Sequence, residues 1–407
     1  MITLEEIKQY VETHKEEALQ CLVDALQSPS PTGSELPMAK TMTKWIEKIG
    51  IPMESYEYMK DRPNLIAEWK GSSEGKTFLF NGHMDVFPPT ETDDANYNPW
   101  SGEIRDNQVF GRGASDMKGG DCAALISVKF LKDMGYDPKG SVVLNYVSDE
   151  ERGGEYGILP LLKEGRLKGD FGISMEPTDM GILVGHGGTY PCKVVVFGDG
   201  GHASYPIKRW DKDNIYGGED AIKKAMKAVE ALNRLQDEVI DKKPETFYGK
   251  SHLAVTMIRA GLEVNNYPRR AEIMIDRRYM PFESPESVDA EIIGALEEIK
   301  KVDPTFAYEY QAPFEPATPV FEIPEDSSIV QTLDEACEKV LGAKPVHMTK
   351  VSGADAAYIK RDIGTMMPWF GPGTFDNIAN ATESVPIDNY LNCIIIYMYT
   401  IVTLLSA

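Results

Sequence analysis

Short apolar runs alternate with amphipathic segments over the first 185 residues, a pattern typical of α/β proteins. Three of these runs, TFLFNGHMD, SVVLNYVSDEE and DFGISMEP, predict buried strands, and each ends on acidic or histidine residues. The segment MKGGDCAALISVKFLKDMG predicts a helix between the first two of these runs. Because the carboxyl ends of strands in an open α/β sheet meet at one crevice, the polar residues at these ends are expected to lie close together.

From about Gly187 the pattern changes. TYPCKVVVFG, HLAVTMIRAG, RAEIMIDRRYM and TFAYEYQ predict strands, and Ser284 followed by Pro285 marks the start of a helix. Another helix is predicted from apolar residues at helical spacing, namely Ile222, Met226, Val229, Leu232 and Leu235. The order strand, helix, strand, strand, helix, strand matches a ferredoxin-like sandwich. We therefore predict a discontinuous α/β domain with a central mixed sheet, residues 1–185 and 316–407, and an inserted ferredoxin-like domain, residues 186–315.

Composition narrows the class of protein. A formal net charge of -22 disfavours nucleic acid or an anionic membrane surface as a partner. The N-terminal MITLEEIKQYVETHKEE predicts an acidic amphipathic helix and lacks the basic and apolar regions of a signal peptide. The apolar CIIIYMYTIVTLL is expected to be too short for a membrane span. The 5 cysteines show no paired spacing, which predicts reduced thiols and a cytoplasmic location.

Candidate chemistry gathers at the predicted strand ends. The residues concerned are a histidine and several carboxylates, in GHMDV, GRGASDMKGG, SDEERGG and SMEPTD: His83, Asp85, Asp116, Glu150, Glu151 and Glu176. One imidazole and several carboxylates in one crevice describe a divalent metal site, most simply a zinc site. Each motif alone has a structural alternative: a buried histidine capped by Asp85, an N-cap role for Asp116, or a solvated acidic loop at Glu150 and Glu151.

With these motifs in order, the chain resembles the zinc-dependent aminoacylase, acetylornithine deacetylase, succinyl-diaminopimelate desuccinylase and glutamate carboxypeptidase family, which also includes bacterial dipeptidases. The resemblance covers nearly the whole length. It implies that His83 and Glu176 bind one metal, that Glu151 binds a second, and that Asp116 bridges the two. Asp85 would orient His83. Glu150 would be the general base, which takes a proton from the attacking water and returns it to the leaving amine.

The same resemblance implies roles in the inserted domain, which would act as a lid and join two chains in a homodimer. His202, in GGHASYP, would polarise the scissile carbonyl in the partner's active site. Asn265 and Arg278 would contact the substrate carboxylate, with Arg277 as the rival for that role and structural salt bridging as the alternative for either arginine. Outside the inserted domain, and independently of the resemblance, backbone groups near Gly353 and Gly371 to Gly373 are expected to line the substrate pocket, unless these glycines serve turns only.

One position departs from the family pattern. The family closes its second metal site with a histidine four residues before a glutamate, and in DNIANATESVPI the glutamate is Glu383 while the histidine position is Ala379. Alanine has no donor atom, so one zinc ion is expected to bind tightly and a second weakly, with Co²⁺ or Mn²⁺ as substitutes. Three explanations stay open: a deliberate replacement, a natural one-metal enzyme, or a non-catalytic descendant that binds its ligand.

The sequence thus predicts a metal-dependent hydrolase of amide bonds in small carboxylate-bearing molecules, either an N-acyl amino acid deacylase or a dipeptidase or carboxypeptidase. Two alternatives remain. The reaction could be hydrolysis of another C–N bond, in a ureido compound or an aryl amine. The chain could also be a non-catalytic protein that binds peptides.

Overall fold

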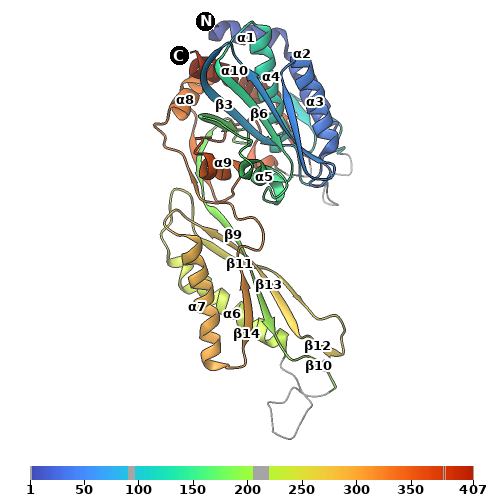
Figure 1. Cartoon of the computed structure of the whole chain (residues 1–407), viewed down its shortest axis with the longest axis vertical. Coiled ribbons are helices and arrows are strands. Elements are labelled where there is room, and N and C mark those ends of the chain that lie inside the picture. The colour runs from blue at the N-terminus through green and yellow to red at the C-terminus, as the bar shows by residue number, and fades with distance from the viewer. Residues whose placement is uncertain (1, 90–96, 205–219, 379, 381, 407) are drawn as a thin grey trace. The chain divides into compact units, whose positions relative to one another are not determined.

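The computed structural model describes residues 2–89, 97–204, 220–378, 380 and 382–406 (Figure 1). The chain forms two compact units. The first consists of Met1–Gly185, Phe321–Met348 and Ala354–Ala407, and the second of His186–Val320 and Thr349–Gly353. The short return segment belongs to the second unit because its backbone bonds there: the Lys350 carbonyl accepts from the amide of Gly187 at 2.9 Å.

The first unit is built on a five-stranded mixed sheet in the order β1-β2-β6-β3-β7. The strands are β1 (Met53–Met59), β2 (Arg62–Lys70), β6 (Lys139–Val147), β3 (Ser73–His83) and β7 (Phe171–Ser174). The last three run parallel to one another, whereas β1 and β2 pair in the antiparallel sense. The prediction of a central mixed sheet is confirmed. Because β6, β3 and β7 are parallel, their carboxyl ends lie at the same edge of the sheet.

Helices and two small sheets complete this unit. The helices are α1 (Leu4–Thr13), α2 (Lys15–Leu26), α3 (Leu36–Ile49), α4 (Gly119–Asp133), α5 (Ile158–Lys163), α8 (Ser328–Leu341), α9 (Asp355–Ile363) and α10 (Ile387–Leu405). One small sheet contains β15 (Phe321–Glu322), β8 (Ile182–His186) and β16 (His347–Lys350); His186, Thr349 and Lys350 are counted with the second unit. The other contains β17 (Ser384–Pro386), β5 (Gln108–Phe110) and β4 (Glu103–Arg105). Short helical turns cover Ala114–Lys118, Glu150–Arg152 and Phe375–Asn377.

Helix α10 corrects one expectation. By length and composition this helix, which has a mean hydropathy of 1.3 over an 18-residue window, could cross a membrane, so the expectation that the stretch is too short is wrong. However, 56% of that window is buried inside the protein, and the side chains of Tyr390, Ile394 and Tyr397 are fully buried in the core. The helix is longer than the apolar run because it begins at Ile387 and includes the polar residues Asp388 and Asn389 in its first turn. Its packing is that of a core helix.

The second unit has the predicted order of elements. Its sheet, in the order β11-β13-β9-β14, contains β9 (Gly188–Phe197), β11 (His252–Ala260), β13 (Arg270–Tyr279) and β14 (Ala307–Gln311), all antiparallel. Helices α6 (Ala221–Glu238) and α7 (Pro285–Val302) share one apolar core with the sheet (Figure 1). A short turn covers Ile240–Lys242, and a separate ribbon pairs β10 (Gly201–His202) with β12 (Asn266–Tyr267). The ferredoxin-like order is confirmed.

The predicted helix is present as α6, but its apolar face is only partly its buried face. Of the residues that mark the apolar face, Ile222 and Met226 are 43% and 66% exposed. The buried residues are mostly small, together with one lysine and two leucines: Ala221, Lys224, Ala225, Ala228, Ala231, Leu232 and Leu235. Alanines allow the helix backbone to pack closely on its neighbours, and a pattern based on large apolar residues does not register this preference.

Candidate metal centre

The candidate ligands lie at the carboxyl ends of the three parallel strands, except for Asp116, which lies in the turn Ala114–Lys118. His83 is the last residue of β3 and pairs with Val147 of β6, so the turn that carries Glu150 begins beside it. Glu176 follows the end of β7, and β7 also pairs with β3. Parallel pairing in register therefore brings residues from three distant segments to one edge of the sheet.

These side chains form two groups that share His83. One ligand atom from each of His83, Glu150 and Glu176 lies within 4.8 Å of the others, and the same holds for His83, Asp116 and Glu151. The Nε2 atom of His83 is 3.2 Å from Oδ1 of Asp116 and 3.9 Å from both Oε2 of Glu150 and Oε1 of Glu176. Geometry thus places Glu150, expected to be a base and not a ligand, as close to the imidazole as Glu176.

The neighbouring Asp85 supports this cluster differently from the expectation. Nδ1 of His83 donates to the backbone carbonyl of Asp85 at 2.8 Å, while its distance to the Asp85 carboxylate is 3.6 Å. The carbonyl can only accept, so Nδ1 carries a hydrogen and Nε2 faces the cluster. The carboxylate itself accepts from the amides of Glu150 at 3.1 Å and Glu151 at 3.3 Å, and from the hydroxyl of Thr32 at 3.0 Å.

Asp116 is held by Glu383, a buried residue from the distant C-terminal segment. Oε1 of Glu383 accepts from the amides of Ser115 at 3.0 Å and Asp116 at 3.2 Å, and Oε2 accepts from Arg112 at 3.0 Å. Asp116 does not precede α4 as its N-cap; Lys118 occupies that position. Ala379 lies outside the described residues, so the structure places Glu383 but not the position where the family has its histidine.

Electrostatics favour a cation here. Burial raises the pKa of Glu150, Glu151 and Glu176 well above the ordinary range, and the Asp116 charge adds to this effect for the last two. Burial lowers the pKa of His83, but its hydrogen bond with Asp116 and the nearby carboxylate charges outweigh burial and raise it. Oε1 of Glu151 is buried without a hydrogen-bond partner. Crowded carboxylates, an orphaned oxygen and an imidazole nitrogen are a donor set that fits a divalent metal.

The loop Gly371–Gly373 packs closely against the two segments that carry Glu176 and Asp116. A Cβ atom on Gly371 would lie 2.5 Å from the carbonyl oxygen of Glu176, and one on Gly373 would lie 2.2 Å from the carbonyl oxygen of Ser115. Such distances are far below van der Waals contact, so both positions require glycine for close backbone packing. The close approach gives Gly371 a structural role; its expected contact with substrate stays a prediction.

Gly373→Ala should therefore destabilise the protein by about 1–3 kcal/mol, the usual cost of overpacking, and displace the Ser115 backbone beside Asp116. Thermal unfolding and metal affinity are the measurements. Gly294→Ala is the control, because no atom lies within 4 Å of its added Cβ. Equal stability of the two variants would contradict this prediction.

The candidate residues of the second unit form a separate set. His202 pairs with Asn266 in the β10–β12 ribbon, and its Nδ1 accepts from the amide of Ser204 at 3.2 Å. The carbonyl of Asn265 accepts from the amide of Ala203 at 2.8 Å. His202 and Asn265 are thus brought together on one exposed ribbon.

The two adjacent arginines differ in their surroundings. Arg277 is fully buried and pairs with Glu283 and Glu291, so it serves as a structural cation. The Arg278 side chain is 31% exposed, and its Nε donates to the Asp276 carboxylate at 3.0 and 3.1 Å. Of the two, only Arg278 retains access to a ligand. Gly353 lies in the second unit as well, where its Cβ would lie 2.5 Å from Thr318.

Sequence reasoning missed Asp355, the first residue of α9. It is buried, one of its oxygens has no hydrogen-bond partner, and burial raises its pKa to about 7. Its carboxylate is hydrogen-bonded by Asn81, two residues before His83, and Asn81 in turn accepts from Asn145 at 2.6 Å. No charge or spacing pattern in the sequence marks Asp355. The available signal was the pair of asparagines, Asn81 and Asn145, which lie opposite each other on β3 and β6.

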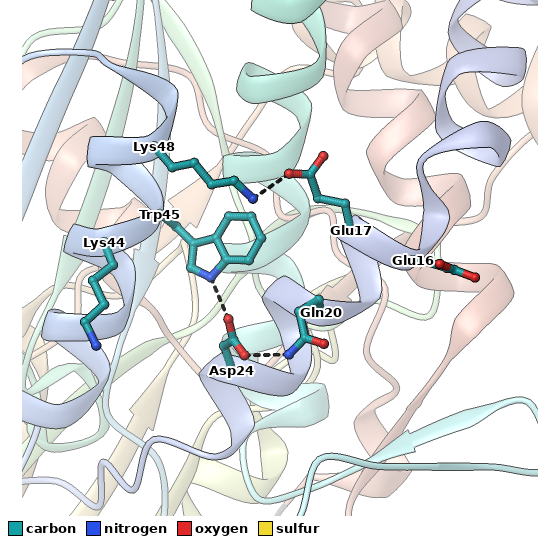
Figure 2. A pocket seen from close by; sticks show the side chains of 7 residues that line it. All are labelled: Glu16, Glu17, Gln20, Asp24, Lys44, Trp45 and Lys48. Carbon is teal, nitrogen blue, oxygen red and sulfur yellow. Dashed lines mark hydrogen bonds and ion pairs between the residues drawn. The ribbon is translucent and has the colours of Figure 1, made fainter.

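A surface pocket of about 570 Å³ lies apart from this cluster, between α2 and α3 (Figure 2). Its polar groups pair mainly with one another: Lys48 with Glu17 at 2.7 Å, and Trp45 with Asp24 at 3.1 Å. We assign no ligand to it.

Comparison with known proteins agrees with this site. Residues 79–403 match peptidase family M20/M25/M40, and the chain belongs to this family. It is therefore an enzyme of the metallopeptidase class that hydrolyses amide bonds in small substrates. A succinyl-diaminopimelate desuccinylase of Sulfurovum sp. (strain NBC37-1) is 31% identical over 304 residues, which cover 72% of this chain and 75% of that protein.

Solved structures share the fold at lower identity. The dipeptidase Dug1p from Saccharomyces cerevisiae is 14% identical with a TM-score of 0.79, over 100% of this chain and 99% of that one. The dinuclear metal binding peptidase YXEP of Bacillus subtilis is 16% identical with a TM-score of 0.67, over 97% and 99% of the two chains. These likenesses support the two-part α/β architecture.

Proposed function

We propose that this chain is a zinc-dependent hydrolase that removes an acyl group from an N-acyl amino acid or cleaves a dipeptide. The observation that carries the proposal is the meeting of one imidazole, that of His83, with two groups of carboxylates: Glu150 and Glu176 in one, Asp116 and Glu151 in the other. Nε2 of His83 can bind one ion only, so carboxylates would hold a second ion, and Asp116 would be shared between the two. The relative that is a desuccinylase and the neighbour that is a dipeptidase support the two substrate classes.

His83, Asp116 and Glu176 would hold one ion, and Asp116 and Glu151 the other. A bound divalent cation would polarise the scissile carbonyl and lower the pKa of the attacking water. Zinc is favoured by the imidazole and carboxylate donors, and Co²⁺ or Mn²⁺ would substitute.

Glu150 is the proposed general base. Its carboxylate would take a proton from water as the water attacks the carbonyl, and would return that proton to the leaving amine. The backbone amide of Glu150 is fixed by Asp85 at 3.1 Å, which holds the start of its side chain in place. Its side chain is 13% exposed, enough for contact with a substrate at the surface of the cluster.

The second unit would supply substrate recognition and a partner. Arg278 and Asn265 would bind the substrate carboxylate, and the partner subunit's His202 would polarise the carbonyl oxygen. A homodimer through this unit is supported by β11, an edge strand whose residues from Thr256 to Ala260 are exposed and include Met257 and Ile258. Exposed apolar edge strands favour pairing with another chain. Sedimentation of Met257→Lys beside the unchanged chain tests this assembly.

The test of the proposed function compares the chain with its Ala379→His variant, because a histidine there would supply the missing donor of the second ion. We expect the variant to gain about one metal per chain and hydrolysis to rise by orders of magnitude. Metal content and turnover of N-acyl amino acids and dipeptides are the measurements. Ala381→His, two residues further, controls for an added imidazole.

If metal content and activity stay unchanged in the Ala379→His variant, the dinuclear proposal is wrong and a one-metal enzyme remains. Tight ligand binding without turnover in both proteins would instead identify a non-catalytic peptide-binding chain. Turnover of only ureido compounds or aryl amines would redirect the substrate class while leaving the metal chemistry in place.

A further inference from the structure

A buried arginine, Arg62, connects two carboxylates, one of which directly precedes Glu150 in the chain. The guanidinium of Arg62, at the start of β2, donates to both oxygens of Glu35, at 2.9 Å through Nε and 2.5 Å through one terminal nitrogen. The same terminal nitrogen lies 2.7 Å from Oδ1 of Asp149. The three side chains are 6%, 0% and 4% exposed, so the network is shielded from solvent.

Asp149 organises the turn that carries the proposed base and one proposed ligand. It directly precedes Glu150 and has a left-handed backbone with φ of 72°, which is unfavourable for a residue with a side chain. Its other carboxylate oxygen accepts from the amide of Tyr156 at 3.1 Å. Its carbonyl accepts from the amides of Arg152 at 3.2 Å and Gly154 at 2.8 Å. Its side chain and backbone therefore close the whole turn.

The same N-terminal loop that supplies Glu35 also reaches the opposite side of this turn. The Thr32 hydroxyl donates to Asp85, whose carboxylate holds the amides of Glu150 and Glu151. The Gly33 amide donates to Glu35 at 2.9 Å. The loop that carries Thr32 and Glu35 thus holds the turn at two points, through Asp85 and, by way of Arg62, through Asp149.

We propose that Arg62 is a positioning residue: its guanidinium, braced on Glu35, fixes Asp149 and so sets the direction of the Glu150 and Glu151 side chains toward the metals and substrate. The inference rests on the proposed function, because that function assigns chemistry to Glu150. The Arg62–Glu35–Asp149 set is called the Arg62 brace below.

The brace depends on the shape of the cation as well as on its charge. A guanidinium presents several N–H groups in one plane and can contact both oxygens of Glu35 and one of Asp149 together. A lysine ammonium at this position would keep the positive charge but could not reproduce that planar fork. Arg62→Lys therefore separates positioning from charge neutralisation.

The experiment compares Arg62→Lys and Arg62→Met with Lys129→Met. Lys129 is the matched control because it also lies between two carboxylates, Glu17 at 3.2 Å and Asp133 at 2.5 Å, in the same unit but away from the turn. Thermal midpoint, kcat and KM, and the visible absorption of the Co²⁺-loaded chain are measured for each. The cobalt spectrum reports ligand geometry without turnover.

We expect both Arg62 variants to lower kcat by about 10–100-fold, as is usual for residues that orient metal-site groups, with KM changed less than about threefold. Their cobalt spectra should change in intensity. Lys129→Met should lower the thermal midpoint yet keep kcat and the spectrum of the unchanged chain. If Arg62→Met does not fold, Arg62→Lys alone gives the comparison.

A normal kcat and cobalt spectrum in Arg62→Lys would overturn the inference, because charge without the fork would then suffice. Equal losses of kcat and of cobalt absorption in Lys129→Met, at the same thermal midpoint, would also overturn the inference, because general destabilisation would then be responsible. Should the unchanged chain hydrolyse none of the substrates, the proposed function fails. In that case the cobalt spectra alone test the role of the Arg62 brace.

Discussion

Glu150→Gln should lower kcat by about 10²–10⁴-fold, the range that a positioned general base contributes. Glutamine keeps the shape of the side chain and the backbone hydrogen bond to Asp85, but it cannot accept a proton at neutral pH. Metal content should be nearly the same as in the unchanged chain, because Glu150 acts on water and substrate in the proposed mechanism. Steady-state kinetics and metal analysis of the purified variant are the measurements.

Two companion variants sharpen this comparison. Glu151→Gln should lose metal as well as activity, since its carboxylate is a proposed ligand. Glu164→Gln, in an exposed pair with Arg166, should change neither. If Glu150→Gln loses metal to the same extent as Glu151→Gln, Glu150 is a ligand, in agreement with its group with His83 and Glu176, and another base must be sought.

His83→Ala should have the broadest effect on metal binding. His83 belongs to both ligand groups, and its Nδ1 bond to the Asp85 carbonyl directs Nε2 toward the carboxylates. Removing the imidazole removes the Nε2 ligand atom that lies beside the carboxylates of Asp116 and Glu176, so bound zinc should fall to below about a tenth and hydrolysis with it. Metal analysis after dialysis, followed by kinetics with added zinc, measures both.

His14→Ala serves as the control for loss of a histidine in the same unit. His14 stacks on Tyr10 and lies outside the metal groups, so this variant should keep its metal. Full zinc content in His83→Ala would contradict the placement of the site. Lost zinc that returns with full activity at high zinc concentration would show instead that His83 sets affinity alone.

Much of the fold could be read from hydrophobic patterning. The alternation of apolar runs predicted the mixed sheet, and the order of elements predicted the ferredoxin-like unit, because these signals are local and repeat along the chain. The face of α6 could not be read in the same way. Ile222 and Met226 are exposed because the alanines opposite them allow closer packing, and only the three-dimensional neighbours decide which surface is buried.

By itself, the sequence determined which residue types stand at strand ends, and the shared topology of parallel strands was enough to predict that His83, Glu150 and Glu176 meet. Tertiary structure decided how they are supported. The carbonyl acceptor for His83 is local, two residues away, whereas long-range contacts set the hold of Glu383 on Asp116 and the Arg62 brace. These contacts join segments as far apart as 267 residues, and no local pattern encodes such pairings. Their geometry exists only once the sheet and its loops have packed.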